Sequence, residues 1–354
     1  MDSDRKRRVV VIGATGNVGT SLVEALSAEA GVSEIVGVAR RPTELAYPKT
    51  TFRVADAAVD DLREIVRGAD VVVHLAWLFQ PTHKPEVTWN NNVLGAIRLF
   101  EAVADEQVPA LVYSSSVAAY SPGPSDRAVT EDWPTHGWPG AAYPREKAYL
   151  ERWLDAFELR NPSMRVVRMR PCFLFKRESA TEQRRLFIGP LAPGRLLRRN
   201  LVPVVPLVAD LNAQVLHTSD AAAAFTQAVI RPVRGAFNIS TMPPVDGPAL
   251  AEFFDARGIR LPRRALRAAT WAAWHLRVAP ASPGLLDTVV QLPLMDSTRA
   301  STELGWHPRF TPHETLETFL GGLRDGAGMS TAPLAPDSAR NRVHEMATGA
   351  GQRQ

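Results

Sequence analysis

The chain has 354 residues, 45% of them hydrophobic, and is therefore long enough to bury a substantial core. Its 41 basic and 37 acidic residues leave a formal net charge of only +4, and the basic runs are scattered, so we expect no nucleic-acid partner. The one cysteine, Cys172, excludes an intrachain disulfide and a cysteine-based metal site, and it is compatible with a reducing cytoplasm.

The first segment is charged and leads directly into the apolar run that begins at Val9, without the features of a signal peptide. No stretch reaches the ~18 apolar residues that a membrane-spanning helix needs. The nearest candidate, residues 265–278, contains Arg267, His275 and Arg277, and we interpret it as an amphipathic packing helix. We therefore expect a cytoplasmic protein with no membrane partner.

The first half of the chain alternates short apolar runs with longer helical patterns, which predicts a parallel sheet covered by helices on both faces. The expected strands are nearly continuous in hydrophobicity, as strands buried on both faces are. They span residues 8–12, 34–39, 51–54, 70–75, 110–113 and 165–169. The expected helices span residues 17–29, 59–66, 87–106 and 143–160. The predicted fold class is α/β, a Rossmann-type doubly wound sheet.

After Pro171 the prolines and glycines become frequent and the strict alternation is lost. We expect a Rossmann domain over residues 1–170, followed over residues 171–325 by a smaller, irregular substrate lobe above the carboxyl ends of the strands. A strand–helix pair near residues 212–230 is expected to return to the sheet. Residues 326–354 are rich in Ala, Gly, Ser and Pro, which predicts a disordered tail.

A glycine-rich turn follows the first expected strand, with the sequence Gly13-Ala14-Thr15-Gly16-Asn17-Val18-Gly19. In such a turn Gly13 permits the tight bend, Gly16 lets the backbone approach a pyrophosphate, and Gly19 allows close packing of helix and strand. The following helix then presents its free N–H groups to the anion. A glycine triplet at the start of a βαβ unit favours a dinucleotide site over a merely structural turn.

The cofactor type is read from the end of the second expected strand, where Arg40 and Arg41 stand and no carboxylate is present. A carboxylate at this place binds the ribose hydroxyls of NAD, whereas a guanidinium pairs with the 2′-phosphate of NADP. We therefore expect NADP, with NAD as the alternative.

Tyr143 and Lys147 lie four residues apart on one face of an expected helix, and Pro144 is tolerated only in its first turn. A tyrosine with its ordinary pKa near ~10 is a poor base at neutral pH. A neighbouring ammonium stabilises the phenolate and lowers that pKa. Ser116 ends a serine run after the fifth expected strand, where its hydroxyl can donate a hydrogen bond to a substrate oxygen.

Together these motifs resemble the extended branch of the short-chain dehydrogenase/reductase superfamily, that is, the NAD-dependent epimerase/dehydratase group, from about residue 9 to residue 322. Further motifs of that family occur in the same order. They are Asp56-Ala57, His74-Leu75-Ala76, Asn92-Val93-Leu94-Gly95, Arg170-Pro171, His217-Thr218-Ser219-Asp220-Ala221 and Leu304-Gly305-Trp306.

The resemblance implies a role for each matching residue. Tyr143 is the expected general acid/base, Lys147 its pKa-lowering partner and ribose ligand, and Ser116 the donor to the substrate oxygen. The expected cofactor-binding residues share their place around the dinucleotide. They are Gly13, Thr15, Gly16, Asn17, Val18, Gly19, Arg40, Arg41, Asp56, Ala57, Leu75, Ala76, Asn92, Tyr143, Lys147 and Pro171.

The chain departs from the family pattern at three places. No asparagine follows the sixth expected strand, where sugar-nucleotide epimerases use one to contact the diphosphate sugar. Lys176-Arg177 replaces the usual glycine-proline, and Ser116-Val117-Ala118 replaces the Thr-Asp-Glu of the dehydratases, so dehydration is disfavoured.

Two groups of residues give opposite indications about the substrate. An aromatic cleft mouth favours an apolar carbonyl compound. Its expected members are Trp77, Phe79, Trp133, Trp138, Phe173 and Phe175. A group of arginines favours a nucleotide diphosphate instead. Its members are Arg184, Arg185, Arg195, Arg198 and Arg199.

The leading interpretation is an oxidoreductase that transfers a hydride between NADP(H) and a carbonyl or alcohol substrate, with Tyr143 as general acid/base. The alternative is a nucleotide-sugar epimerase with tightly bound NAD(P). A second alternative is a non-catalytic NADP-sensing regulator, although a sensor has no need of the Ser116, Tyr143 and Lys147 set. We expect a small-molecule substrate and no metal. The family's dimers imply a homodimer through the helices that carry Asn92 and Tyr143.

Overall fold

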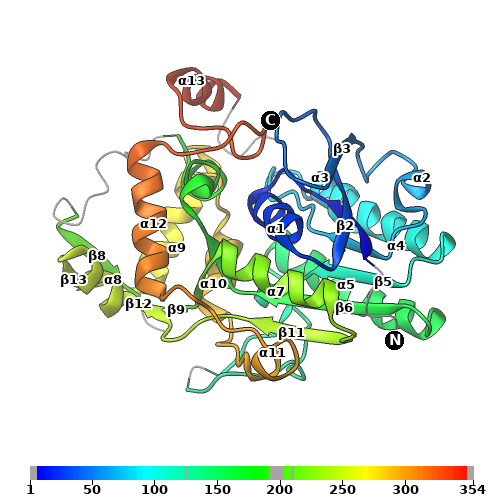
Figure 1. Ribbon diagram of the computed structural model, residues 1–354. Helices are drawn as coiled ribbons and strands as arrows, with labels where there is room; N and C mark the ends of the chain where they lie inside the picture. The colour runs from blue at the N-terminus through cyan, green and yellow to red at the C-terminus, as the bar shows by residue number, and fades with distance from the viewer. Residues whose placement is uncertain (1–5, 125, 191–201, 209–210, 349–354) are drawn as a thin grey trace.

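The computed structural model describes residues 6–124, 126–190, 202–208 and 211–348. At its centre is a parallel sheet of 7 strands in the order β11-β6-β5-β4-β1-β2-β3 (Figure 1). The strands are β1 Arg7–Ile12, β2 Val32–Ala39, β3 Thr50–Val54, β4 Val71–His74, β5 Ala110–Ser114, β6 Arg165–Pro171 and β11 Gly235–Ile239. Because the order reverses beside β1, a crevice opens between the carboxyl ends of β1 and β4. The Rossmann-type fold predicted from the sequence is confirmed.

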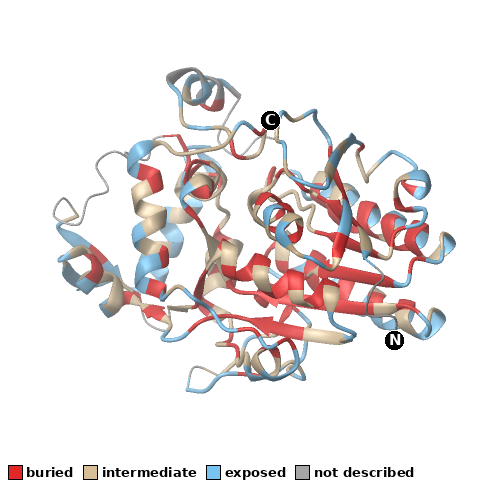
Figure 2. Cartoon of the chain, in the orientation of Figure 1, coloured by how far each residue is buried: buried red, intermediate tan, exposed pale blue. Residues whose placement is uncertain are grey.

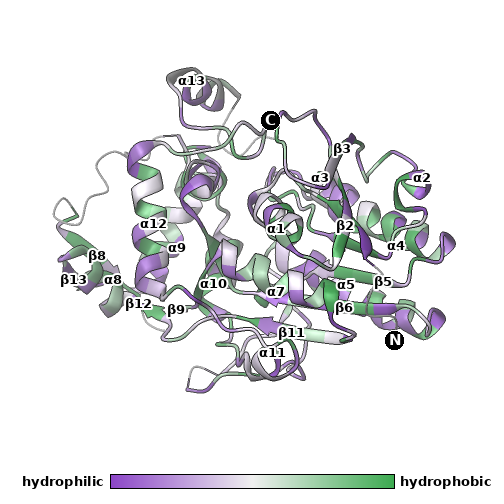
Figure 3. Ribbon diagram, viewed as in Figure 1, coloured by the Kyte–Doolittle hydropathy of each residue, from purple (hydrophilic) through white to green (hydrophobic). Residues whose placement is uncertain are grey.

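Helices cover both faces of this sheet, and alternate residues of each strand serve one face or the other. Val9 and Val11 face the layer of α1 (Asn17–Ala28) and α7 (Thr218–Ile230). Val10 faces the opposite layer, which α4 and α5 form. Those helices are α4 Gly95–Asp105 and α5 Ala142–Arg160. The inner strands of the sheet are mostly buried between the layers (Figure 2), whereas the edge strand β3 is largely exposed. Hydrophobic stretches are visible on β5 and β6 (Figure 3).

The helix expected over residues 87–106 is divided into three parts. A short helix α3 (Pro85–Thr88) leads into a π-helical turn, η1 (Trp89–Leu94), and then into α4. A π-helical turn inside a helix often lies at a functional site. This one carries Asn92, which is buried. The preceding expected helix is also shorter than its pattern, since α2 spans only Arg63–Val66.

The second lobe is built from short strand pairs and helices. Its pairs join β7 (Phe173–Phe175) to β10 (Val215–His217), β9 (Asn212–Ala213) to β12 (Val245–Asp246), and β8 (Val204–Leu207) to β13 (Arg257–Arg260). Its helical segments are η3 Arg177–Ser179, α6 Ala180–Gln183, η4 Arg184–Ile188, α8 Gly247–Phe254, α9 Arg263–His275, α10 Pro283–Gln291, α11 Thr298–Glu303 and α12 Pro312–Asp325. In the described part of the chain no helix has the length and apolar character to cross a membrane.

The returning strand–helix pair differs from the expectation in its strand. The strand β10 pairs with β7 in the second lobe, and only α7 reaches the central layer, beside α1. The seventh strand of the sheet is β11, which pairs with β6. Its apolar run is interrupted by Asn238, which is fully buried and donates to the carbonyl oxygens of Val129 and Asp296. Because this polar residue lies within the apolar run, the hydropathy pattern does not predict the strand.

The disordered tail expected from residue 326 is a second difference, because the described residues 326–348 pack on the second lobe and end in the helix α13 (Ala339–Thr348). Leu334 is fully buried. Arg185 of η4 donates to the carbonyl oxygen of Pro333 at 2.7 Å, and Thr181 donates to that of Ala327 at 2.7 Å. The polar composition of this segment predicted disorder, but its backbone carbonyls accept hydrogen bonds from side chains on α6 and η4. These partners are distant in the sequence, so the composition of the segment alone does not reveal them.

Candidate active site

A large cavity of about 860 Å³ lies at the carboxyl ends of the central strands. Every residue that the sequence predicted for the catalytic or cofactor site lines it. The cavity runs from the glycine-rich turn and Arg41 at one end, past Tyr143, to the second lobe. The predicted site residues are therefore brought together at one place.

The glycine-rich turn has the geometry that the spacing predicts. Gly13 has a φ of +89°, and its backbone N–H donates to the carbonyl oxygen of Val38 at 2.9 Å. A Cβ on Gly19 would lie 2.1 Å from the Gly13 carbonyl oxygen, so only glycine lets α1 pack so closely. Gly16 is the N-cap of α1, and no side chain caps the helix. The first N–H groups of α1 are thus available to an anion, which fits a dinucleotide pyrophosphate.

The two sides of the turn are held by side chains from distant segments. Asn17 donates to the carbonyl oxygen of Leu174 at 3.2 Å and accepts from the hydroxyl of Thr218 at 3.1 Å. Lys176, which replaces the family's usual glycine, donates to the hydroxyls of Thr20 at 2.6 Å and Ser21 at 3.0 Å. These bonds attach β7 and the loop after it to α1. Lys176 therefore has a structural role at this position, where the chain departs from the family pattern.

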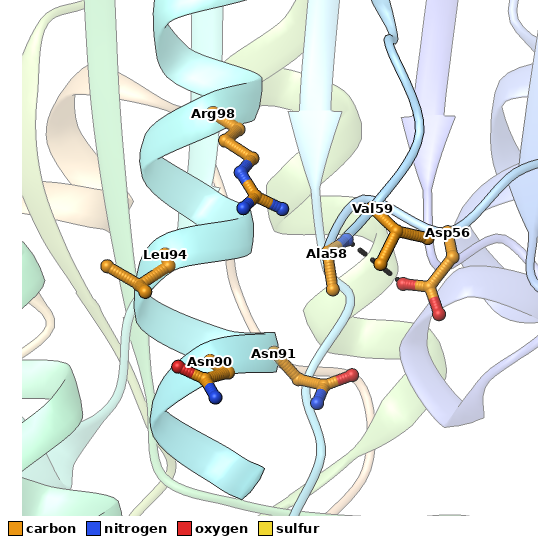
Figure 4. Close-up of a pocket in the computed structure, with 7 residues that line it drawn as sticks. All are labelled: Asp56, Ala58, Val59, Asn90, Asn91, Leu94 and Arg98. Atoms are coloured by element: carbon orange, nitrogen blue, oxygen red, sulfur yellow. Dashed lines mark hydrogen bonds between the residues drawn. The ribbon is translucent and has the colours of Figure 1, made fainter. Parts of the chain in front are cut away.

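At the far end of the cavity, Arg40 and Arg41 follow β2 and are exposed. Asp56 follows β3, and its carboxylate accepts the backbone N–H of Ala58 at 3.0 Å. A smaller hollow opens beside Asp56, between this segment and the first turns of η1 and α4 (Figure 4). Its other lining residues are Ala58, Val59, Asn90, Asn91, Leu94 and Arg98. Asp56 thus lies at the same end of the cavity as Arg40 and Arg41, since β3 pairs with β2.

Tyr143 lies in the first turn of α5 and is packed between aromatic rings. The Phe79 ring centroid lies 4.6 Å from that of Tyr143, and the Trp77 ring meets Tyr143 edge-on at 5.6 Å. Burial raises the pKa of Tyr143 to about 12, while a hydrogen bond with Ser116 opposes the rise. The expectation that Lys147 lowers this pKa is not met here, because burial makes the largest contribution and Lys147 is not among the groups that shift the pKa of Tyr143. At neutral pH the phenol is a proton donor.

Lys147 lies one helical turn further along α5 and is almost fully buried. Its ammonium donates to the carbonyl oxygen of Ser114 at 2.7 Å and lies 3.5 Å from the centre of the Trp77 ring. It is 6.0 Å from the centre of the Tyr143 ring. Burial holds the pKa of Lys147 well below its usual range, and the carboxylates of Glu146 and Glu151 oppose that shift.

Ser116 follows β5 and begins a short 3-10 turn, where its hydroxyl accepts the N–H of Ala118 at 3.1 Å. The neighbouring Ser115 donates instead to the buried carboxylate of Glu151 at 2.5 Å. Arg170 pairs with the same carboxylate through two bonds of 2.9 Å. All three serines of the run line the cavity, and the Ser115 hydroxyl is bound to the buried Glu151–Arg170 ion pair.

The second-lobe motifs of the family meet each other in the structure. The Asp220 carboxylate is fully buried and accepts from the Arg309 and Phe310 backbone N–H groups at 2.8 and 3.0 Å. The Trp306 indole donates to the Asp220 carbonyl oxygen at 2.8 Å. These residues fix α7 to the segment before α12. They line no part of the cavity, so their role is structural.

The aromatic cleft mouth is only partly as expected. Trp77, Phe79, Phe173 and Phe175 line the cavity, and Phe187 adds to them, with its ring edge-on to Phe79 at 5.4 Å. Trp133 and Trp138 do not line it. Aliphatic side chains of η4 and α10 continue this apolar wall. They are Leu186, Ile188, Leu285, Leu286, Val289 and Leu292.

The expected arginine group is not assembled as a group in the described residues. Arg184 is buried and paired with Glu345 at 3.3 Å. Arg185 lines the cavity and holds the C-terminal segment through Pro333. Arg195, Arg198 and Arg199 lie outside the residues that the structure describes.

The sequence interpretation missed Glu146, Thr88 and Leu78. Glu146 is buried and accepts from Thr88 at 2.5 Å and from Asn92 at 2.7 Å. The available signal was a carboxylate on the inner face of α5, directly before Lys147. Among the described residues no group of His, Cys, Asp and Glu side chains is arranged to hold a metal ion.

Comparison with known proteins gives a family match over residues 9–240, to the NAD dependent epimerase/dehydratase family. An uncharacterized protein of Mycobacterium tuberculosis is 26% identical over 328 residues, which are 89% of this chain and 83% of that protein. A UDP-glucose 4-epimerase of Corynebacterium glutamicum is 24% identical over 338 residues, which are 87% of this chain and 93% of that enzyme.

Among solved structures, a UDP-glucose 4-epimerase from Thermus thermophilus, described in complex with NAD, superposes with a TM-score of 0.64 at 20% identity. The match covers 90% of this chain and 99% of that one. At this identity the likeness establishes the fold, including the central sheet.

Proposed function

This chain belongs to the NAD dependent epimerase/dehydratase family, and on that premise we propose that it is an enzyme that moves a hydride at a carbinol or carbonyl carbon. The observation that carries the proposal is the meeting of Ser116, Tyr143 and Lys147 on the cavity that the glycine-rich turn also lines. The turn, with its uncapped helix N-terminus, fits a nicotinamide dinucleotide. Such a cofactor supplies or accepts the hydride.

The residues of the chain supply the proton transfer and the orientation. Ser116 and Tyr143 both line the cavity, and their hydroxyls hold the substrate oxygen between them. Because burial keeps Tyr143 protonated at neutral pH, Tyr143 donates its proton when a carbonyl is reduced. For a carbinol to be oxidised, Tyr143 must first be the phenolate, which then takes the carbinol proton, so this direction requires its pKa to fall when cofactor and substrate are bound. Lys147 contributes a positive charge and a hydrogen-bond donor, and its ammonium is held by the carbonyl oxygen of Ser114.

Two kinds of reaction use this chemistry. The comparisons favour the epimerase alternative over the net oxidoreductase that leads the sequence interpretation, because UDP-glucose 4-epimerases occur among both the curated relatives and the solved neighbours. We therefore propose epimerisation of a nucleotide sugar, in which oxidation and reduction alternate at one carbon. The cofactor is then regenerated in each cycle.

Net reduction of an apolar ketone is the second candidate, and a specific observation favours it. The part of the cavity beyond Tyr143 is lined by Phe79, Phe187 and the aliphatic side chains of α10. Such a wall favours a hydrophobic substrate over a diphosphate.

We propose NADP as the cofactor, with NAD as the alternative. The support is the position of Arg40 and Arg41 at the adenosine end of the cavity, after β2. A guanidinium there pairs with a 2′-phosphate. The Thermus thermophilus relative is described with NAD, and substitution of Arg40 distinguishes the two cofactors.

Purified protein incubated with a panel of UDP-sugars, and separately with apolar ketones, tests the proposal. Product is followed by chromatography and reduced cofactor by its absorbance. Conversion of a UDP-sugar without net change of the cofactor supports the epimerase, and net oxidation of NADPH by a ketone supports the reductase. If neither occurs, or if Tyr143→Phe converts substrate as fast as the wild type, the proposed function is wrong.

A further inference from the structure

Glu146 is a buried carboxylate in the first turns of α5, directly before Lys147. Both of its oxygens are used within the protein: one accepts from the Thr88 hydroxyl at 2.5 Å and the other from the Asn92 amide at 2.7 Å. Glu146 itself does not line the cavity, whereas its partner Asn92 does. Burying a carboxylate costs free energy of folding unless the carboxylate is hydrogen-bonded. The two bonds offset this cost and fix the position of the Glu146 side chain.

Asn92 passes the constraint on to the segment after β4. Its amide oxygen accepts the backbone N–H of Leu78 at 2.7 Å, and its amide nitrogen donates to the Leu78 carbonyl at 2.9 Å. The same nitrogen donates to Glu146. The carboxylate therefore fixes which way the Asn92 amide faces, because the reversed amide would place its oxygen against a carboxylate and its N–H₂ against the Leu78 N–H.

Leu78 stands between the two aromatic residues that touch the proposed catalytic pair. On one side, the Trp77 ring lies under the Lys147 ammonium at 3.5 Å from the ring centre. On the other side, the Phe79 ring packs on Tyr143 at 4.6 Å between centroids. A shift of the Leu78 backbone moves both rings together. The hydrogen bonds from Glu146 through Asn92 thus hold Leu78, whose two neighbours contact Lys147 and Tyr143.

We propose that Glu146 is a positioning residue for the reaction, which holds Asn92 and through it the Trp77–Leu78–Phe79 segment against Tyr143 and Lys147. The inference rests on the proposed function, since it assigns Glu146 a part in the same chemistry. It concerns orientation, because Glu146 touches neither Tyr143 nor the cavity. Thr88 completes the set as the second donor to the carboxylate.

The two substitutions that separate orientation from charge are Glu146→Gln and Glu146→Met. Glutamine keeps an oxygen that accepts from Asn92, and its amide can donate to the Thr88 hydroxyl, which already donates to the Pro85 carbonyl. Methionine has a similar volume and can hold neither partner. Glu131→Gln is the matched control, because that carboxylate accepts the Asn238 backbone N–H at 2.8 Å away from the cavity.

We expect Glu146→Met to lower kcat on the order of 10- to 100-fold with little change in KM, since small displacements at a reacting centre have this effect. Glu146→Gln restores kcat to within about threefold of the wild type, as a positioning role requires. A second readout is independent of turnover. The indole N–H resonance of Trp77, assigned with Trp77→Phe, shifts in Glu146→Met and stays in place in Glu146→Gln and Glu131→Gln.

Wild-type turnover in Glu146→Met, together with an unmoved Trp77 resonance, overturns the inference, whereas the loss of activity in Tyr143→Phe would still support the proposed function. If instead the wild type has no activity on either panel but Glu146→Met moves the Trp77 resonance, the proposed function fails and the positioning of the segment stands. If Glu146→Met does not fold, Asn92→Ala breaks the same chain at its next link. That variant must show the same kcat loss and resonance shift, or the inference is wrong.

Discussion

The Lys147 ammonium lies 3.5 Å from the centre of the Trp77 indole ring, so the cation of the proposed catalytic set is placed on an aromatic face. An indole face attracts a cation, by roughly 0.5–2 kcal/mol according to its exposure. Burial acts in the other direction and lowers the pKa of Lys147. The ring therefore helps to keep the buried amine charged.

Trp77→Leu is expected to move the alkaline limit of activity to lower pH. Without the ring the effect of burial is less opposed, so the pKa of Lys147 falls by about 0.4 to 1.5 units, since one unit corresponds to ~1.4 kcal/mol. The pH dependence of kcat measures this shift. The exposed Trp271→Leu is the matched control and should leave the profile unchanged. An unshifted alkaline limb in Trp77→Leu contradicts the role of the ring.

Tyr143→Phe is expected to lower kcat by about 10²- to 10⁴-fold, which is the usual contribution of a general acid/base. Cofactor affinity should stay within a few-fold of the wild type, because the ring and its packing remain. Tyr149→Phe on the same helix removes a hydroxyl from a residue that is 44% exposed, and it serves as the control. Equal loss in both variants would indicate a general effect on α5.

Arg40→Asp is expected to weaken NADPH binding by roughly 10- to 100-fold, because a charge-assisted hydrogen bond is lost and a repulsive carboxylate is introduced. The affinity for NADH should change little, since NADH carries no 2′-phosphate. Titration of the intrinsic fluorescence with each cofactor gives both constants. Arg53→Asp, on the exposed edge strand β3, is the control. A parallel loss for both cofactors would remove the support for NADP.

His74 predicts a pH dependence of stability. The ring is buried, neither nitrogen has a hydrogen-bond partner in the described structure, and burial lowers its pKa from 6.5 to about 3. Between these values the unfolded chain binds the proton and the folded chain does not, so the free energy of unfolding falls as the pH drops below about 6.5. At pH 5 the contribution is about 2 kcal/mol.

Replacing His74 by Phe should flatten this part of the stability curve, measured by urea unfolding between pH 7 and pH 5. The exposed His307→Phe should keep the wild-type slope. If His74→Phe runs parallel to the wild type over that range, the histidine does not carry the dependence.

The features that the sequence predicted correctly are those with local causes. The Gly13 turn follows from spacing within one βαβ unit, and the placement of Tyr143 and Lys147 on one cavity wall follows from one helical turn. The direction of the Tyr143 pKa could not be obtained in this way, because it depends on the rings of Trp77 and Phe79, which belong to another segment. Spacing gives proximity along a helix and says nothing about desolvation.

The features that sequence reasoning missed depend on contacts between distant segments. The role proposed for Glu146 depends on its hydrogen bonds with Asn92 on η1 and Thr88 on α3, which are distant from it in the sequence. The strand β11 was missed because its buried Asn238 is satisfied by carbonyl groups elsewhere in the chain. In each case a polar residue is made compatible with burial by partners that no hydropathy window contains.

The C-terminal segment that packs on η4 has a kinetic consequence. Thr331, Ala332 and Pro333 line the same cavity as Gly16 and Arg41. We expect a chain truncated before residue 326 to release bound NADPH faster than the full chain after dilution, because these three residues no longer line the cavity. An equal rate of release in the two chains contradicts this role of the C-terminal segment.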